Sequence, residues 1–189
     1  MLLSPQQRVL AISNKAWADA LWSYSGADGI ISYFISGQSA KSGRRRTKIS
    51  TKEQAGIEQA LQQLDRITGL EFIQTHIRQE SDIEFHKVLA YETPSISGET
   101  RKQAGWFEIS WLDKGGKRLT NEERFVITHE LGHAAGLDHP FGNGYDSNFS
   151  SSQTVMSYNL DGPAPLNYTE LDQQALRAIW SVQVGPPPQ

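Results

Sequence analysis

The chain has 189 residues, 38% of them hydrophobic and 21% charged, which suits one domain with a single core and is too little for two ordinary domains. Its net charge of −3 provides no basic field that would attract nucleic acid or an anionic membrane surface. It contains no cysteine, so a disulfide, a catalytic thiol and a thiolate metal ligand are all excluded.

The first part of the chain predicts a helix followed by a strand. Ser4-Pro5 is a favourable helix start, and apolar residues recur at helical spacing from there until Gly26. Residues 30–35 are β-branched and aromatic, as in a strand, and residues 41–48 predict a charged loop. Residues 1–22 mix polar and apolar side chains, so we expect neither a signal peptide there nor a transmembrane helix elsewhere.

The middle of the chain predicts a strand–helix–strand unit. Ser50 or Thr51 can cap a helix that carries one apolar stripe and ends before Gly69. The order of elements favours a parallel pair of strands packed against this helix. The strands that follow the helix are predicted at residues 70–75 and 82–86. Further strand candidates are residues 88–92 and 105–111.

The last third of the chain predicts two helices separated by irregular structure. Thr120 and Glu123 form a capping-box pattern, and a helix should run from there to about Ala135. Residues 136–168 are rich in Gly, Asn, Ser, Asp and Pro, which favours a long irregular segment of the kind that commonly carries function. A final amphipathic helix and a proline-rich tail are predicted at residues 170–180 and 185–189.

A cluster of candidate metal ligands lies in the first of these two helices. His129 and His133 are four residues apart, so their imidazoles project from one face and can bind one ion together. Glu130 lies beside them, where it cannot easily be a third ligand but can reach a water at the metal as a general base. Gly136 is expected to end the helix in the left-handed conformation and to return the chain, so that His139 reaches the same ion.

Three neutral imidazoles leave the fourth position of a zinc ion open for water, as in catalytic rather than structural sites. A His-Glu-x-x-His pair alone occurs by chance on ordinary helices, but Gly136 and His139 at fixed offsets make the pattern far more specific. Asp138 either orients a neighbouring imidazole or caps a turn, and the sequence does not distinguish these roles. The sequence therefore predicts one catalytic zinc ion held by His129, His133 and His139.

The segment HELGHAAGLDH, residues 129–139, matches the signature of the metzincin zinc proteases, and VMSY at 155–158 resembles the methionine-containing turn that follows it. Pro140 after the third histidine makes the chain most similar to the serralysin branch. The resemblance implies an α+β fold in which residues 1–189 form a single catalytic domain. An upper subdomain, about 1–136, would hold a twisted mixed sheet with two long helices, and a lower irregular subdomain, about 137–184, would hold one C-terminal helix.

The resemblance also implies roles for two residues of the turn. Met156 would form an apolar floor beneath the zinc, the alternative being an ordinary core methionine. Tyr158 would be a fifth zinc ligand that swings away to donate to the oxyanion, or a tyrosine hydrogen-bonded in the lower subdomain. Serralysins are secreted and usually carry C-terminal calcium-binding repeats, so the resemblance implies an extracellular protein. Residues 142–146 contain only a fragment of such a repeat, which does not support calcium and predicts a turn.

The function predicted from the sequence is that of a zinc-dependent endopeptidase. Glu130 would take the proton of a water activated by zinc and return it to the leaving amine. The substrate would bind extended along an edge strand, for which residues 88–92 are the candidate. The alternatives are a non-catalytic or latent zinc-binding interaction module and a zinc hydrolase that acts on a non-peptide bond. We expect a monomer whose partner is a protein or peptide substrate, with no nucleic acid and no membrane insertion.

Overall fold

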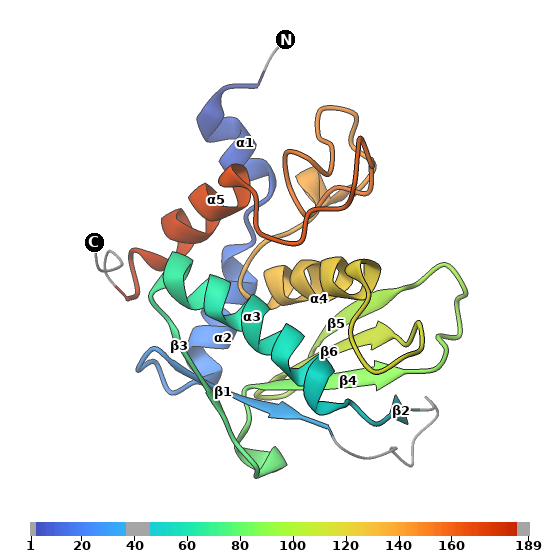
Figure 1. Ribbon diagram of the computed structural model, residues 1–189. Coiled ribbons are helices and arrows are strands. Elements are labelled where there is room, and N and C mark those ends of the chain that lie inside the picture. The colour runs from blue at the N-terminus through green and yellow to red at the C-terminus, as the bar shows by residue number, and fades with distance from the viewer. Residues whose placement is uncertain (1–2, 37–45, 185–189) are drawn as a thin grey trace.

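The computed structural model of the protein describes residues 3–36 and 46–184. Most of the charged loop at 41–48 and the tail at 185–189 therefore lie outside the described residues. The elements in chain order are α1 (Pro5–Ala11), α2 (Lys15–Tyr24), β1 (Ile30–Ile35), β2 (Arg46–Thr47), α3 (Thr51–Thr68), β3 (Glu71–Gln74), η1 (Arg78–Glu80), β4 (Ile83–Val88), β5 (Gly98–Lys102), β6 (Phe107–Leu112), α4 (Asn121–Ala134), η2 (Pro140–Gly142) and α5 (Glu170–Trp180) (Figure 1).

The strands form one mixed sheet in the order β3-β1-β4-β6-β5. The first four of these strands are parallel to one another, whereas β5 runs antiparallel to β6 and occupies one edge. The short strand β2 pairs antiparallel with the end of β4. The predicted parallel pair around a helix is present, because β1 and β3 are neighbours and α3 connects them.

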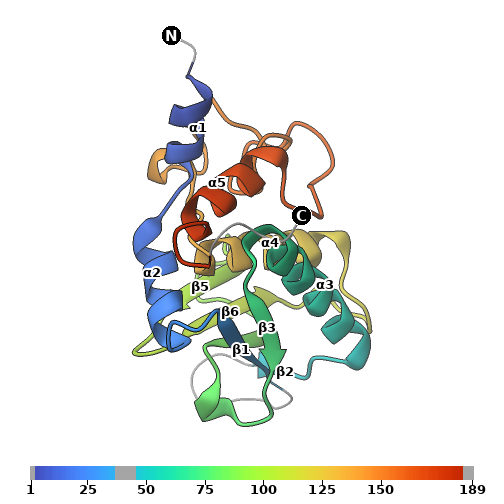
Figure 2. The same ribbon diagram turned by 90° about the vertical axis from the view of Figure 1, so that its left-hand side faces the viewer.

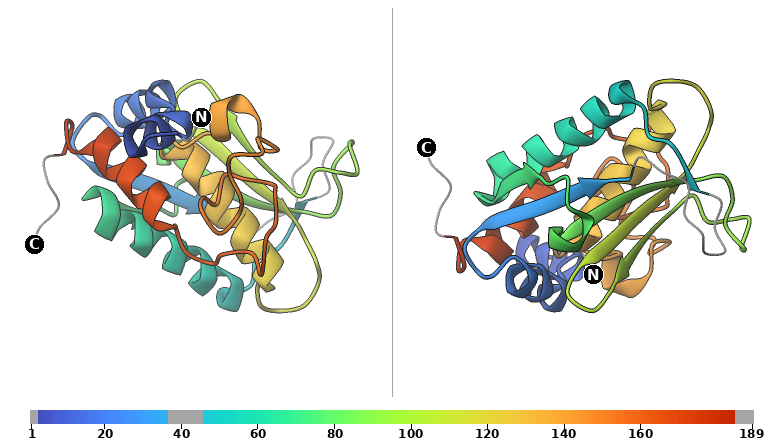
Figure 3. Two further views of the ribbon diagram at one scale, coloured as in Figure 1. Left: turned by 90° about the horizontal axis from the view of Figure 1, so that it is seen from above. Right: turned by 90° about the horizontal axis from the view of Figure 1, so that it is seen from below.

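The helices gather on one face of the sheet, as the views from above and below show (Figure 3). Alternate strand residues such as Ile31, Phe85 and Ile109 are fully buried and belong to the same hydrophobic core as the apolar stripe of α3. The helix α4 lies next to α3, and its buried side chains complete the core. This packing fixes α4, the helix with the histidine pair, against the sheet.

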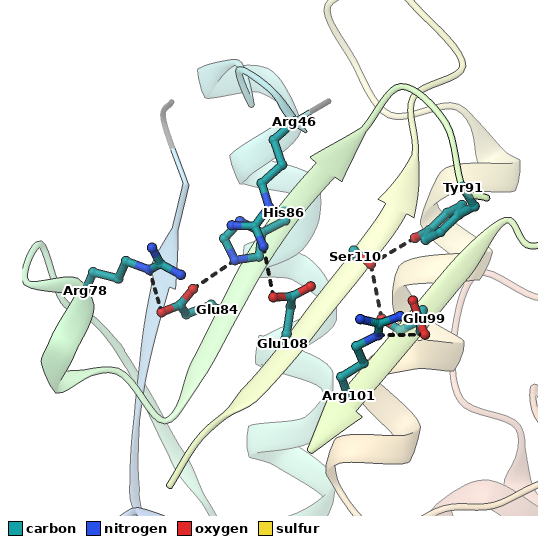
Figure 4. Close-up of polar contacts among 9 residues, drawn as sticks. All are labelled: Arg46, Arg78, Glu84, His86, Tyr91, Glu99, Arg101, Glu108 and Ser110. Atoms are coloured by element: carbon teal, nitrogen blue, oxygen red, sulfur yellow. Dashed lines mark hydrogen bonds and ion pairs between the residues drawn. The ribbon is translucent and has the colours of Figure 1, made fainter. Parts of the chain in front are cut away.

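The opposite face of β4 and β6 carries polar side chains that are nevertheless buried (Figure 4). Glu84 accepts from Arg78 at 2.7 Å and lies 2.8 Å from His86, and Glu108 accepts from Arg46 at 2.9 Å. Buried charges need such partners, because an isolated ion would lose its hydration without compensation. Ser110 lies 2.9 Å from the hydroxyl of Tyr91 on the same face.

The helix boundaries follow the capping residues that the sequence shows. Ser50, Thr120 and Thr169 each accept from a backbone N–H three residues later, and the residue at that position bonds back to the cap. Gly69 ends α3 in the left-handed conformation, as predicted. Of the helices described, none is both long enough and apolar enough to cross a membrane.

Two sequence predictions are wrong at the level of elements. The single helix expected before Gly26 is two helices, α1 and α2, because Ser13 between them forms an isolated antiparallel bridge with Leu137. The edge strand expected at residues 88–92 is instead β5, which the sequence did not suggest. Because the helix is interrupted between α1 and α2, α1 lies beside α5 and away from the sheet (Figure 2).

Candidate metal centre

Three imidazoles converge at the C-terminal end of α4. His129 and His133 lie one turn apart on that helix, and Gly136 follows it with a φ of +100°, which only glycine adopts without strain. The chain returns at this glycine, so His139 comes back towards the helix. One ring nitrogen from each of the three histidines lies within 4.8 Å of the other two.

The hydrogen bonds of two rings leave their second nitrogen available. His129 Nδ1 lies 2.8 Å from the carbonyl oxygen of Val155, and His133 Nδ1 lies 3.1 Å from that of Leu137. A carbonyl only accepts, so Nδ1 carries the hydrogen and Nε2 keeps its lone pair. Burial lowers the pKa of His129, and it lowers the pKa of His133 to about 4. Both rings are therefore neutral ligands near pH 7.

The third ring tests whether this donor set fits a metal ion. His139 Nε2 lies 3.2 Å from His129 Nε2, a contact that requires a proton or a cation between the two nitrogens. Burial also lowers the pKa of His139, which disfavours the extra proton. A tetrahedral zinc ion with bonds of about 2.05 Å places its nitrogen ligands roughly 3.3 Å apart. The residues present therefore fit zinc.

Glu130 is held beside the histidines by the edge strand β5. Its side chain is 7% exposed, and the Thr100 hydroxyl donates to its Oε2 at 2.9 Å and to its carbonyl oxygen at 2.7 Å. Burial raises the pKa of Glu130 to about 8, although the bonds from Thr100 act in the opposite direction. Gly98 leaves room for the carboxylate, since a Cβ there would lie 2.8 Å from Oε1. Neither Gly98 nor Thr100 could be recognised as part of the site from a local sequence pattern.

The tyrosine of the turn lies against two of the histidines. The Tyr158 ring centroid is 4.7 Å from that of His139 and 5.5 Å from that of His129, and the residue is 42% exposed. Burial, followed by the charge of Glu130, raises the Tyr158 pKa to about 12. The ring lies so close to Gly144 that a Cβ there would be 2.4 Å from its Cδ2. The turn predicted at 142–146 therefore seats this tyrosine, and ligation by Tyr158 stays a prediction.

The turn that contains Met156 packs against the helix that carries His129 and His133. Met156 is fully buried, and its Sδ would lie 3.2 Å from a Cβ at Gly132, between the two helical histidines. The buried Asp172 of α5 accepts from the Thr154 hydroxyl at 2.5 Å and from the Val155 N–H at 3.0 Å. This carboxylate fixes the segment whose carbonyl binds His129. Asp172 connects α5 to the segment at residues 154–155, and no local sequence pattern predicts this contact.

Asp138 bonds to a backbone N–H and to a side-chain amide, and not to an imidazole. Its Oδ1 accepts from the His139 N–H at 2.8 Å, and its Oδ2 accepts from the Asn14 side-chain amide at 2.8 Å. Of the two roles left open by the sequence, the structure supports the stabilisation of a turn. The partner is a residue 124 positions earlier in the chain.

A pocket of about 480 Å³ opens between β5 and the irregular segment beyond α4. His129 and Glu130 line one wall, and Gly98 of the edge strand lies next to them. Apolar side chains such as Phe125 and Leu160 form another part of the lining, together with two serines and two tyrosines, Ser95, Ser97, Tyr145 and Tyr158. The pocket thus joins a candidate metal ligand, a buried carboxylate and an apolar wall.

No protein-family model matches the sequence, and no curated protein matches it. Among solved structures, the chain is similar to a chain of the GM1 bound form of the ECX AB5 holotoxin, with a TM-score of 0.53 and 15% sequence identity. The similarity covers 84% of this chain and 82% of that chain. At this identity the likeness shows a shared fold, and the binding of GM1 belongs to the holotoxin.

These comparisons overturn the expected assignment to the metzincins of the serralysin branch. The structural similarity is to a toxin chain, and no protease family model matches. The physical reason is that the signature at residues 129–139 spans one helix end and one turn. This signature specifies the local arrangement of three imidazoles and a carboxylate, and such an arrangement does not determine the rest of the fold. The function must therefore be argued from the site itself.

Proposed function

We propose that the chain is a zinc-dependent endopeptidase. The observation that carries this proposal is the convergence of three imidazoles beside the buried carboxylate of Glu130, at the wall of an open pocket. His129 and His133 bond through Nδ1 to carbonyls and present Nε2 to the shared position. Three neutral nitrogen donors leave a fourth zinc position for water or substrate, the arrangement of catalytic sites.

Zinc bound there would acidify a water and polarise the substrate carbonyl. Glu130 lies next to the first ligand in sequence and in space. The positive charge of the bound zinc would lower the Glu130 pKa from about 8, so that its carboxylate would be ionised and would take the proton of that water. The water oxygen forms the new bond to the peptide carbon. As the carbon–nitrogen bond breaks, the carboxylate returns the proton to the leaving amine. Thr100 holds Oε2 during both transfers through its hydroxyl.

The edge strand β5 supports a peptide as the substrate. It is the terminal strand of the described sheet on the pocket side, and Gly98 and Thr100 both contact Glu130. An edge strand can bind an extended segment through main-chain hydrogen bonds, which delivers a peptide bond to the adjacent carboxylate. The hydroxyl of Tyr158, which lines the same pocket, would serve as a donor for the developing oxyanion.

The test is cleavage of unfolded casein by the purified chain loaded with zinc. Wild type, Glu130→Gln and Glu122→Gln are compared, with and without a zinc chelator, and bound zinc is measured in each protein. Glu122 is an exposed acid on the same helix, paired with Lys114, and serves as the matched control. We expect wild type and Glu122→Gln to cleave casein, and the chelator to abolish cleavage.

Glu130→Gln should bind zinc and lose cleavage by a factor of at least about 100, because general base catalysis contributes on this scale. A wild-type chain that binds zinc and leaves casein intact would favour the zinc-binding interaction module. A chain that binds no zinc would refute the metal centre itself. Cleavage of small esters without cleavage of casein would favour hydrolysis of a non-peptide bond.

A further inference from the structure

The junction between α1 and α2 is bound to the turn that carries the third histidine. The Asn14 N–H donates to the Gly136 carbonyl at 2.7 Å, and the Asp138 N–H donates to the Ile12 carbonyl at 2.9 Å. These two bonds form the isolated antiparallel bridge between Ser13 and Leu137. We call residues 12–14 the N-terminal brace.

The side chain of Asn14 does not cap the helix that it precedes. Asn14 occupies the N-cap position of α2, where asparagine usually accepts from a backbone N–H of the first turn, but it makes no such bond. Its amide donates instead to Asp138 Oδ2 at 2.8 Å. The other oxygen of that carboxylate accepts from the His139 N–H. One side chain thus connects the start of α2 to the backbone of a candidate ligand.

The brace also reaches a second candidate ligand. Leu137, the bridge partner of Ser13, provides the carbonyl that lies 3.1 Å from His133 Nδ1. A hydrogen bond of this kind fixes the orientation of a metal-binding imidazole and the nitrogen that it presents. Displacement of residues 136–138 would therefore move His139 and release His133 together.

The packing at Gly136 shows that the brace and the turn fit closely. A Cβ at Gly136 would lie 2.8 Å from the Ala18 Cβ and 3.3 Å from the Asn14 carbonyl oxygen. The first turn of α2 therefore packs directly on the turn that leads to His139. Trp17 extends this contact, since its ring centroid lies 5.9 Å from that of His133.

We propose that Asn14 is a positioning residue of the metal centre, which holds His139 and His133 in ligand geometry through Asp138 and the 136–138 turn. This inference rests on the zinc site of the proposed function. It predicts that zinc affinity depends on a side chain that touches no ligand ring and lies in a different helix from the histidine pair. It concerns metal binding and makes no statement about the substrate.

The experiment measures zinc affinity by competition with a chromogenic chelator, and records the absorption spectrum of the cobalt-loaded protein. Asn14→Asp places a second carboxylate next to Asp138, so the two groups repel. The double variant Asn14→Asp/Asp138→Asn restores the pair: the new amide at position 138 donates to the new carboxylate at position 14 and still accepts from the His139 N–H. Ser25→Ala is the control, because the Ser25 hydroxyl donates to the Trp22 carbonyl at the opposite end of α2.

Asn14→Asp should bind zinc about 10- to 100-fold more weakly than wild type, with weakened cobalt bands, and the double variant should recover most of the loss. Ser25→Ala should match wild type. Equal affinities in wild type and Asn14→Asp would overturn the inference, as would equal losses in Asn14→Asp and the double variant. If Asn14→Asp does not fold, Asn14→Ala replaces it, and unfolding of both would show a folding contact instead. Absence of zinc binding by wild type would refute the proposed function, which is a separate outcome.

Discussion

Two groups of potential metal ligands lie among the residues that the structure describes, and one of the two is available to an ion. In the first, three histidines present nitrogens within 4.8 Å of one another. In the second, oxygens of three carboxylates, Glu53, Asp113 and Glu123, come equally close. The Lys87 ammonium donates to Glu53 at 2.7 Å and lies 3.6 Å from Asp113, so the carboxylate group already holds a cation.

The difference lies in what the ligand atoms already bind. Glu53 and Glu123 are the acids of two capping boxes, and each also accepts from the backbone at the start of α3 or α4. The carboxylates are thus used by Lys87 and by two helix ends. His129 and His133 use Nδ1 for carbonyls and keep Nε2 available, and His139 directs its Nε2 towards that of His129. Proximity of ligand types is therefore insufficient, and the decisive observation is a free donor atom on each residue.

The largest effect should come from removal of a histidine. Metal binding of about 10–16 kcal/mol over four zinc ligands corresponds to roughly 3 kcal/mol each, so His133→Ala should weaken zinc binding on the order of 100-fold. Glu123→Gln, in the carboxylate group, should leave zinc affinity unchanged. Competition with a chromogenic chelator measures both. A fall in affinity in Glu123→Gln comparable to that in His133→Ala would erase the distinction between the groups.

Removal of Lys87 should leave the negative charge of the carboxylate group without a neutralising cation. Lys87→Met leaves the buried Glu53 without its cation, and loss of one partner from a buried ion pair costs about 3 kcal/mol of unfolding free energy. Three carboxylates then suit a hard cation, so millimolar calcium should recover part of the loss. Urea unfolding with and without calcium measures this, with wild type as the control. A variant as stable as wild type would show that Lys87 does not neutralise the cluster.

The features of the two groups that could be predicted from the sequence depend on residues close together in the chain. The capping box at Thr120 predicted the start of α4, because a cap and its partner are three residues apart, and of the two caps expected for α3, Ser50 or Thr51, the structure has Ser50. The helical spacing of His129 and His133 and the left-handed Gly136 likewise depend on neighbours in the chain. These features place the histidine group without knowledge of the sheet.

The parts that sequence missed depend on contacts between distant segments. The strand β5 has the sequence GETRK, whose glycine and charged residues carry no strand signal, and it exists through its pairing with β6. Nothing local indicates that Thr100 would bond Glu130, or that Asn14 would bond Asp138. The break between α1 and α2 has the same origin, since Ser13 pairs with Leu137.

The histidine group also differs from the carboxylate group because a candidate general base, Glu130, lies beside it. The position of the Glu130 carboxylate depends on the absence of a side chain at Gly98. In Gly98→Ala the new methyl would meet Val126 Cγ1 at 2.3 Å and Glu130 Oε1 at 2.8 Å, so the carboxylate must move. We expect casein cleavage to fall about 10- to 100-fold while zinc affinity is unchanged, because a small displacement of a catalytic group has this effect. Gly162→Ala is the control, since nothing lies within 4 Å of that position. Equal activities in the two variants would contradict the placement of Glu130 by β5.

The smallest effect concerns the acid stability that the carboxylate group confers. Burial acts to raise the pKa of Glu53, but hydrogen bonds from Lys87 and Ser50 outweigh it and lower the pKa below its ordinary value of 4.5. The ionised group therefore contributes stability that is complete above about pH 4.5 and is lost as the pH falls through the folded-state pKa. Glu53→Gln should be less stable than wild type at pH 7, and the gap should narrow at pH 4 and below. Urea unfolding at several pH values, with exposed Glu122→Gln as the control, measures the gap, and a gap independent of pH would show that ionisation of Glu53 does not stabilise the fold.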